Sequence, residues 1–216
     1  MLEHLKDVAP FDTLSDAELD PLVSRAAVRK YKKNTLVIHQ GDETDSLYIL
    51  REGQMKVYVE DENGREHTVR IMQEGDSFGE LALVGDFPRS ANVMTLSEAS
   101  AFVISKANFM DCLRHNPDFS FALIQSLAHK VRDTTSELTH LALSDVYGRL
   151  VHIMEKYAQE QDGKPCFPKF THREIANMIG SSREMVSKIL KDLEKGDYIT
   201  VSQNHYVINK SLPSSW

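Results

Sequence analysis

The spacing of hydrophobic residues changes along the chain and separates it into stretches of different predicted structure. In residues 1–30, apolar residues recur three or four positions apart, as on one face of a helix, and Ser15 with Glu18 forms a capping-box pattern. From Lys33 to Ser105 the period is two, which is typical of strands with one buried face. Six of the ten glycines lie between these strands, at positions 41, 53, 64, 75, 79 and 85. This pattern predicts an antiparallel β-sandwich or jelly roll.

The β-rich stretch contains one strong hairpin signal. Its predicted strands are residues 36–38, 47–50, 55–59, 67–71, 91–94 and 101–104. Asn63-Gly64 lies between the third and fourth strands and favours a two-residue type I′ turn, in which both central residues have positive φ. Four acidic residues flank it, Glu60, Asp61, Glu62 and Glu66. We interpret this acidic tip as a solvated hairpin, with a contact for a basic partner as the alternative.

The next stretch predicts two helices in succession. Residues 106–116 form the first, which ends at Asn116-Pro117 because proline fits the first turn of a following helix. The second helix has hydrophobic positions at alternating spacings of three and four, interrupted by one threonine: Ile124, Leu127, Val131, Thr134, Leu138 and Leu141. This heptad seam predicts that two chains pair along the helix. The alternative is an amphipathic helix packed on its own domain.

The last third of the chain predicts a helical hairpin. Thr171 and Glu174 form a capping box at the start of one helix. Gly180 supplies a turn, and Ser181 or Ser182 caps the next helix. This arrangement predicts a helix-turn-helix, although many helical hairpins with a glycine turn bind no DNA.

Two further stretches surround this hairpin. Residues 159–168 are rich in Gln, Gly, Asp and Pro and predict a loop. Residues 196–209 predict a β-hairpin with strands at 198–201 and 206–208. The β-hairpin of residues 196–209 would be the wing of a winged helix-turn-helix.

Candidate binding chemistry is concentrated in residues 78–93. Glu80 precedes Arg89 by nine residues, and Ser90 follows the arginine directly. The planar guanidinium can give paired, charge-assisted hydrogen bonds to two phosphate oxygens, and Glu80 can accept from a ribose hydroxyl. We therefore interpret the segment as a nucleotide pocket, with a surface ion pair as the alternative.

Charge and composition limit the partners and the compartment. The chain of 216 residues is long enough for two domains, and its net charge is −7. Residues 1–105 hold 11 Lys and Arg against 19 Asp and Glu, whereas residues 106–216 hold 14 against 13, so the second half can still present a basic face to DNA. No apolar run is long enough for a membrane helix and the N-terminus has mixed charge, so we expect a cytoplasmic protein with no membrane partner.

The same composition argues against metal and catalytic sites. Cys112 and Cys166 are far apart and belong to no Cys/His cluster, which predicts free thiols and neither a disulfide framework nor a metal centre. Catalysis would need a second carboxylate or a base at a useful distance from Glu80, and the sequence offers neither, so we expect no enzyme activity.

The motifs resemble those of one family. Phe78-Gly79-Glu80-Leu81-Ala82 and Pro88-Arg89-Ser90-Ala91 resemble the phosphate-binding cassette of cyclic-nucleotide-binding domains. The helix-turn-helix resembles that of the CRP/FNR family of bacterial transcription regulators, and this similarity runs from end to end of the chain. The resemblance implies that cAMP contacts the backbone or side chains of Gly79, Glu80, Leu81, Ala82, Arg89 and Ser90.

The resemblance also implies an adenine site on the paired helix. In cAMP-binding members of the family, a Thr-Ser pair reads the adenine from both subunits, and the matching residues are Thr134 and Thr135. Thr135-Ser136 is the alternative register. Ser90 and the threonine pair favour cAMP over cGMP.

The same resemblance assigns the DNA contacts. It implies that base edges in the major groove are read by Arg183, Glu184, Ser187 and Lys188, and that phosphates are contacted by Thr171, His172 and Ser182. Lys188 stands where the family usually has arginine. Because lysine lacks the bidentate guanidinium, we expect weaker discrimination between bases at that base pair. We expect a palindromic site with TGTGA-like half-sites in double-stranded DNA.

The sequence therefore predicts an α+β protein of three parts. They are a cyclic-nucleotide-binding β-roll with N-terminal helices (1–105), a short helix with the dimerisation helix (106–144), and a winged helix-turn-helix (145–216). The resemblance implies a homodimeric, cAMP-responsive regulator whose acidic hairpin contacts RNA polymerase. Cyclic di-GMP, a haem-bound gas with a ligand such as His39, His67 or His115, and binding to DNA without any ligand are the alternatives. FNR-like oxygen sensing is not expected, because the sequence lacks the cysteine cluster that would bind an iron–sulfur centre.

Overall fold

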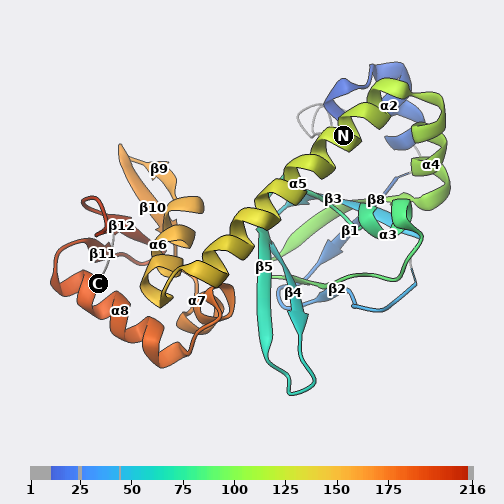
Figure 1. Ribbon diagram of the computed structural model, residues 1–216. Helices are drawn as coiled ribbons and strands as arrows, with labels where there is room; N and C mark the ends of the chain where they lie inside the picture. The colour runs from blue at the N-terminus through green and yellow to red at the C-terminus, as the bar shows by residue number, and fades with distance from the viewer. Residues whose placement is uncertain (1–10, 24–25, 44, 214–216) are drawn as a thin grey trace. The chain divides into compact units, whose positions relative to one another are not determined.

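The computed structural model describes residues 11–23, 26–43 and 45–213 (Figure 1). Contacts within the chain divide it into two compact units. The first consists of Met1–Asp61 and Val69–Arg132, and the second of Glu62–Thr68 and Asp133–Trp216. The helical pattern expected through Leu2, Leu5 and Val8 lies outside the described residues.

The N-terminal part of the chain is an antiparallel β-roll between helices. Its elements are η1 (Phe11–Thr13), α2 (Asp16–Val23), β1 (Ala27–Tyr31), β2 (Leu36–Ile38), β3 (Ser46–Glu52), β4 (Met55–Glu60), β5 (Glu66–Met72), β6 (Ser77–Phe78), α3 (Glu80–Gly85), β7 (Asn92–Thr95), β8 (Ala99–Ser105) and α4 (Lys106–His115). The strands form two four-stranded sheets, in the orders β1-β8-β3-β6 and β2-β7-β4-β5. The predicted jelly roll is therefore confirmed.

Two strands and one turn differ from the sequence prediction. The pattern missed β1, whose residues have no buried face, and β6, which has only two residues. The predicted type I′ turn at Asn63-Gly64 is wrong. Five residues lie between the end of β4 at Glu60 and the start of β5 at Glu66. Of Asn63 and Gly64, only Gly64 has positive φ, at 75°. The longer loop removes the need for two left-handed residues.

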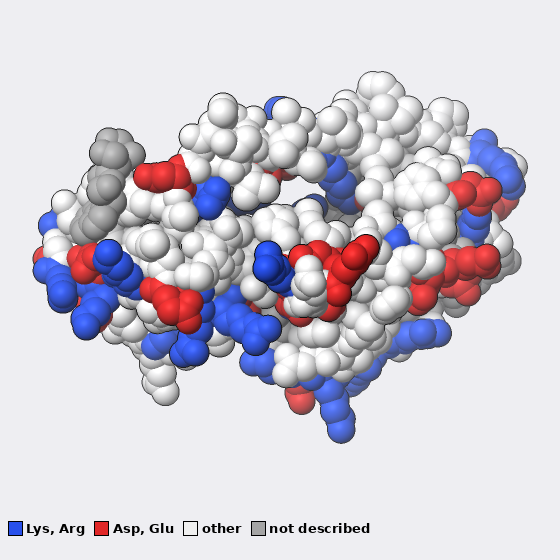
Figure 2. Space-filling model, turned by 60° about the horizontal axis from the view of Figure 1, so that its bottom comes forward, with Lys and Arg blue, Asp and Glu red and all other residues white. Residues whose placement is uncertain are grey.

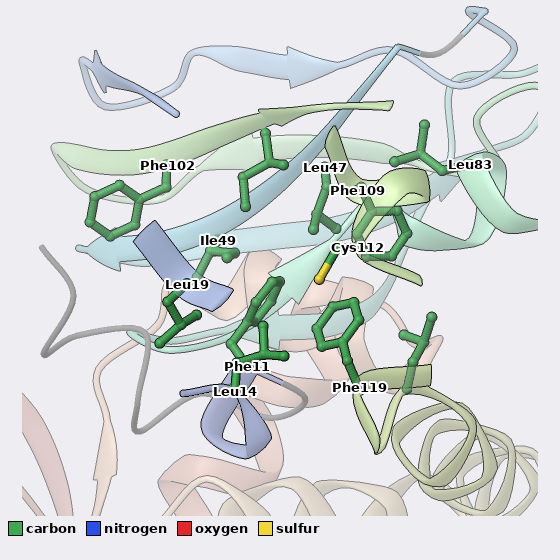
Figure 3. Packing of buried hydrophobic residues seen from close by; sticks show 12 residues of the cluster. Phe11, Leu14, Leu19, Leu47, Ile49, Leu83, Phe102, Phe109, Cys112 and Phe119 are labelled. Carbon is green, nitrogen blue, oxygen red and sulfur yellow. The ribbon is translucent and has the colours of Figure 1, made fainter. Parts of the chain in front are cut away.

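A cluster of aromatic and aliphatic side chains fills one side of the roll (Figure 3). The ring centroids of Phe11 and Phe119 lie 5.2 Å apart, and those of Phe109 and Phe119 lie 6.0 Å apart. Leu83, which comes from α3, belongs to the same cluster. The core therefore fixes the helix that carries the candidate cassette to the helices that precede and follow the roll. Cys112 also lies here, and burial raises the pKa of its thiol to about 11.

One long helix, α5 (Pro117–Leu143), follows the roll and begins at the proline, as predicted. Its first turns contribute Phe119, Ala122 and Leu123 to the core. Four large apolar side chains on another face are mostly exposed in the single chain: Phe121 (61%), Ile124 (60%), Val131 (67%) and Leu138 (63%). Leu127 of the predicted seam is partly buried and packs against the roll. The exposed stripe is therefore rotated slightly away from the predicted one.

The C-terminal part contains a helical hairpin and a small sheet. Its elements are α6 (Val146–Lys156), β9 (Gln159–Gln161), β10 (Lys164–Pro168), α7 (His172–Ile179), α8 (Arg183–Lys195), β11 (Ile199–Val201) and β12 (His205–Ile208). The four strands are antiparallel, in the order β11-β12-β10-β9. The predicted winged helix-turn-helix is present in full.

The loop predicted for residues 159–168 is wrong, because this segment is a β-hairpin. Asp162 and Gly163 both have positive φ, 51° and 74°, and join β9 to β10. Asp-Gly is a strong turn signal of the same kind as Asn-Gly, but the polar residues on both sides of it favour a loop in the sequence pattern. Cys166 and Phe167 of β10 are buried.

Helix α6 is joined to the end of α5 by a small charged cluster in the second unit. Glu137 accepts hydrogen bonds from Lys156 Nζ (2.6 Å) and from His152 Nε2 (3.0 Å). The His152 ring stacks on His140 with centroids 3.8 Å apart. Burial raises the pKa of Glu137, but the bonds from Lys156 and His152 outweigh it and leave the pKa below its usual value.

This lowered pKa predicts an acid-dependent loss of stability. A carboxyl group whose pKa is lowered by folding stabilises the protein above its unfolded-state pKa of about 4.3, and this contribution disappears as the pH falls through the lower folded-state value. Glu137→Gln should therefore reduce the free energy of unfolding by about 0.5–1 kcal/mol at pH 7, a small value because the group is one-third exposed. Urea denaturation at pH 7 and pH 3 should show a smaller difference at pH 3 than at pH 7. Equal differences at both pH values would contradict the assignment.

Candidate functional site

Helix α3 and the loop after it place the predicted cassette on the edge of the β-roll. Ala82 and Leu83 are buried, whereas Leu81, Val84 and Phe87 are each 45% exposed. The turn before α3 depends on Gly79, which has φ of 89°. A Cβ atom at this position would lie 2.3 Å from Nη1 of Arg89, so no other residue fits without moving the guanidinium.

Arg89 is buried, with 7% of its surface exposed. Its Nη1 donates to the carbonyl oxygen of Gly79 (2.9 Å), and its Nη2 donates to that of Ser46 (2.6 Å). The guanidinium carbon lies 5.8 Å from the centre of the Tyr48 ring. Two carbonyls and one ring therefore hold the side chain, while the fork has further N–H donors for a ligand. Burial lowers the pKa of Arg89 because it disfavours the charged form. An anion placed beside the guanidinium would act in the opposite direction and favour the charged form.

Glu80 is paired with a residue that the sequence did not indicate. Only 4% of Glu80 is exposed, and its Oε1 accepts from Lys130 Nζ at 2.7 Å. Lys130 also donates to the carbonyl oxygen of Ser77 (3.3 Å). A carboxylate this deeply buried needs a cation or several hydrogen bonds, and Lys130 of α5 supplies the cation through one charge-assisted hydrogen bond. The cassette and the long helix are thus connected directly within the first unit.

Removing this cation should be costly. Lys130→Met leaves the Glu80 carboxylate buried without its ion pair. We expect a loss of about 3 kcal/mol in the free energy of unfolding, at the lower end for a buried pair because 27% of the Lys130 side chain is exposed. Urea denaturation of the ligand-free protein measures it. The double variant Lys130→Met/Glu80→Gln should recover much of the loss, because it buries no unpaired charge. Additive losses in the double variant would show that the two groups do not interact.

The predicted adenine contacts lie further along α5. Thr134 is one turn after Lys130, so the two residues share a face of the helix. Thr135 is four residues after Val131 and three before Leu138, on the face with the exposed apolar stripe. Both threonines are exposed and belong to the second unit, whereas Glu80 and Arg89 belong to the first.

The helix-turn-helix is fixed by caps at the positions that the sequence indicated. Thr171 Oγ1 accepts from the backbone N–H of Glu174 (3.2 Å), and the Glu174 carboxylate accepts from that of Thr171 (2.6 Å). Gly180, with φ of 58°, ends α7. Ser182, rather than Ser181, caps α8 by accepting from the backbone of Met185.

Helix α8 has one buried and one exposed face. Val186, Ile189, Leu190 and Leu193 are buried. Three of the four residues predicted to read base edges, Arg183, Glu184 and Lys188, are exposed on the other face. Figure 2 shows Lys and Arg side chains gathered among acidic ones on the C-terminal unit. This face could meet a polyanion, although its acidic residues would weaken non-specific attraction.

Ser187, the fourth of these residues, is half-buried and bonded inside the protein. Its Oγ lies 2.6 Å from Nδ1 of His172 and donates to the carbonyl oxygen of Arg183 at 2.9 Å. His172, assigned to phosphate, therefore has one ring nitrogen committed to α8. The sequence did not indicate the contact with His172, because residues 15 positions apart meet only through the packing of α7 on α8.

Comparisons with known proteins agree with this architecture. A family profile described as "Cyclic nucleotide-binding domain" matches residues 28–116, and one described as "Crp-like helix-turn-helix domain" matches residues 146–211. The cAMP-activated global transcriptional regulator CRP of Pasteurella multocida is 32% identical over 200 residues, which cover 89% of this chain and 95% of that protein. The cAMP-activated regulator Vfr of Pseudomonas aeruginosa is 31% identical over 199 residues, which cover 88% and 92%.

A solved structure extends the agreement to the fold. The regulator CLP of Xanthomonas campestris, described as responsive to c-di-GMP, superimposes with a TM-score of 0.77 at 21% identity and covers 91% of this chain and 100% of that one. The chain belongs to the CRP/FNR family of DNA-binding transcription regulators, with a cyclic-nucleotide-binding domain and a Crp-like helix-turn-helix. Within the described part of the chain, every helix is too short or too polar to cross a membrane.

Proposed function

We propose that this protein is a homodimeric, cytoplasmic transcription regulator that binds cAMP in its β-roll and thereby gains affinity for a palindromic DNA site. The observation that carries the proposal is the arrangement of Arg89, Glu80 and Lys130 around the cassette. It combines a buried, pre-positioned guanidinium with a buried carboxylate that α5 holds directly.

The chemistry of this arrangement suits a cyclic mononucleotide. A cyclic phosphodiester carries one negative charge, which the single buried guanidinium can neutralise while its donors reach two phosphate oxygens. Glu80 has the acceptor capacity for a ribose 2′-hydroxyl next to that phosphate. The exposed apolar side chains of Leu81 and Val84 on α3 could be covered by the ligand.

The base would be read on α5. Thr134 shares its helix face with Lys130, and Thr135 shares the face of the apolar stripe. In a dimer that pairs along the stripe, Thr134 would face the nucleotide of its own subunit and Thr135 that of the partner. This supports the register Thr134-Thr135 over Thr135-Ser136, since Ser136 lies beyond both faces.

Control of DNA binding would follow from the same helix. Because α5 carries Lys130 and the apolar stripe, a ligand that competes for Glu80 changes the environment of the dimer seam as well as the pocket. A ligand shifts an equilibrium only if it binds one state better than another, and the contact with α5 gives cAMP that differential affinity. Asp145, which caps α6, would be the hinge to the helix-turn-helix.

The output would be transcriptional. Arg183, Glu184 and Lys188 would read TGTGA-like half-sites in the major groove, with Thr171, Ser182 and the second ring nitrogen of His172 near phosphates. RNA polymerase is the protein partner that we assign to the acidic loop between β4 and β5. The likeness to family members that regulate transcription supports both assignments.

Cyclic di-GMP is the second candidate ligand, because CLP has this fold and is described as responsive to it. A cyclic dinucleotide has two phosphates, whereas the cassette buries one arginine, which favours cAMP. Haem sensing is less well supported, since His39 and His115 are exposed and contact Asp42 and Asp111 of their own turns.

Calorimetric titration of the purified protein with cAMP, cGMP and cyclic di-GMP tests the proposal, with anisotropy of a labelled TGTGA-N6-TCACA duplex followed in parallel. Saturable cAMP binding that tightens the DNA complex is expected. DNA binding that no nucleotide affects would contradict control by a nucleotide. Tighter binding of cyclic di-GMP than of cAMP would make cyclic di-GMP the ligand. A visible absorption band in the purified protein would point to haem.

A further inference from the structure

The contact between His172 and Ser187 restricts what α8 can offer to DNA. Ser187 lies on the face of α8 that carries Arg183, Glu184 and Lys188, and its hydroxyl is held between two protein groups. One is Nδ1 of His172, the first residue of α7, at 2.6 Å. The other is the carbonyl oxygen of Arg183, one turn earlier in α8, at 2.9 Å.

The single hydroxyl proton of Ser187 is used inside the protein in either tautomer of His172. If Nδ1 carries a proton, it donates to Oγ, and the hydroxyl donates to the Arg183 carbonyl. If Nδ1 is unprotonated, the hydroxyl donates to it instead. In both cases the oxygen keeps a lone pair but no proton for an outside partner.

A serine that can rotate freely accepts or donates, and so it distinguishes bases poorly. We propose that His172 is a positioning residue that makes Ser187 a hydrogen-bond acceptor on the reading face of α8, which selects a base with a major-groove amino group. Only cytosine, through N4, and adenine, through N6, offer such a donor in the major groove. Guanine and thymine present acceptors there and would face the lone pair of Oγ.

This inference rests on the proposed function, because it needs α8 to lie in the major groove. It adds a determinant of base specificity that is formed by one residue of α7, His172, and one of α8, Ser187. It also separates two roles of His172, since Nδ1 orients Ser187 while Nε2 can donate to a phosphate when it carries a proton. A phosphate contact alone would change affinity equally for all sequences, whereas a positioning role changes the preference at one base pair.

The test is selection of bound duplexes from a library with randomised half-sites, sequenced for the wild type, Ser187→Ala, His172→Leu and His172→Asn in the presence of cAMP. Asparagine is the matched control, because its side-chain amide can donate to Oγ as Nδ1–H does. At one position of each half-site, the wild type should prefer cytosine or adenine over thymine or guanine about threefold to tenfold, as expected for one hydrogen bond. Ser187→Ala should lose this preference, His172→Leu should reduce it, and His172→Asn should retain it.

Several outcomes would overturn the proposal. They are a preference at that position that survives Ser187→Ala, a wild-type preference there for guanine or thymine, and a uniform loss of affinity in His172→Leu with base preferences unchanged. Thermal denaturation of each variant excludes unfolding as the cause. If the wild type enriches no palindrome, the proposed function itself fails. If it enriches a palindrome that Ser187→Ala leaves unaltered, only this inference fails.

Discussion

Replacing Arg89 with glutamine is expected to lower the affinity for cAMP by about a hundredfold or more and to abolish the cAMP-dependent increase in DNA affinity. The guanidinium is the buried cation that the cassette holds against the carbonyls of Gly79 and Ser46. Loss of two charge-assisted hydrogen bonds to a phosphate removes roughly 3 kcal/mol, which corresponds to that factor. Calorimetry measures the first effect, and anisotropy with the palindromic duplex measures the second.

Arg89→Lys is the matched control for charge. Lysine keeps the positive charge but loses the planar fork, so it should bind cAMP with an affinity between those of the wild type and Arg89→Gln. Urea denaturation is needed for both variants, because Arg89 also ties the loop before β7 to β3 through Ser46. Unchanged cAMP binding by a folded Arg89→Gln protein would remove the phosphate site from the cassette.

The sequence indicated the predicted cassette because its residues are contiguous. Gly79, Glu80 and Arg89 lie within eleven positions, so local chemistry was sufficient to interpret them. Ser46 and Lys130 were missed, although both touch the site, because they come from 43 positions before Arg89 and 50 positions after Glu80. One signal was available, since Lys130 precedes Thr134 by one helical turn. Its pairing with Glu80, however, depends on where the core places α5.

The fold shows the same division between local and long-range information. Periodicity identified the buried strands and α5, and caps identified α7 and α8, because each depends on neighbouring residues. Periodicity failed at β1, which has no buried face to create an alternating pattern. It also did not indicate that Leu127 of the predicted seam packs against the roll, because a spacing of three or four cannot tell which hydrophobic face meets the roll and which remains exposed.

The exposed apolar stripe of α5 leads to the second large effect. Val131→Glu/Leu138→Glu should convert a dimer to a monomer and weaken binding to the palindromic duplex by about a hundredfold or more. Both side chains are about two-thirds exposed in the single chain, so the substitutions disturb the monomer little. In a paired helix, each would place a carboxylate opposite its symmetry mate in an apolar seam, which is strongly unfavourable. A monomer contacts one half-site and loses the second set of contacts.

Sedimentation of the two proteins measures the change in association, and anisotropy measures binding to the duplex. Gln125→Glu is the matched control, because Gln125 is exposed on α5 outside the apolar stripe and the substitution adds the same charge. The control should remain dimeric and bind DNA as the wild type does. If the double variant also remains dimeric, the stripe of Phe121, Ile124, Val131 and Leu138 is not the dimer interface, and the adenine-reading role of Thr135 in the partner subunit would lose its basis.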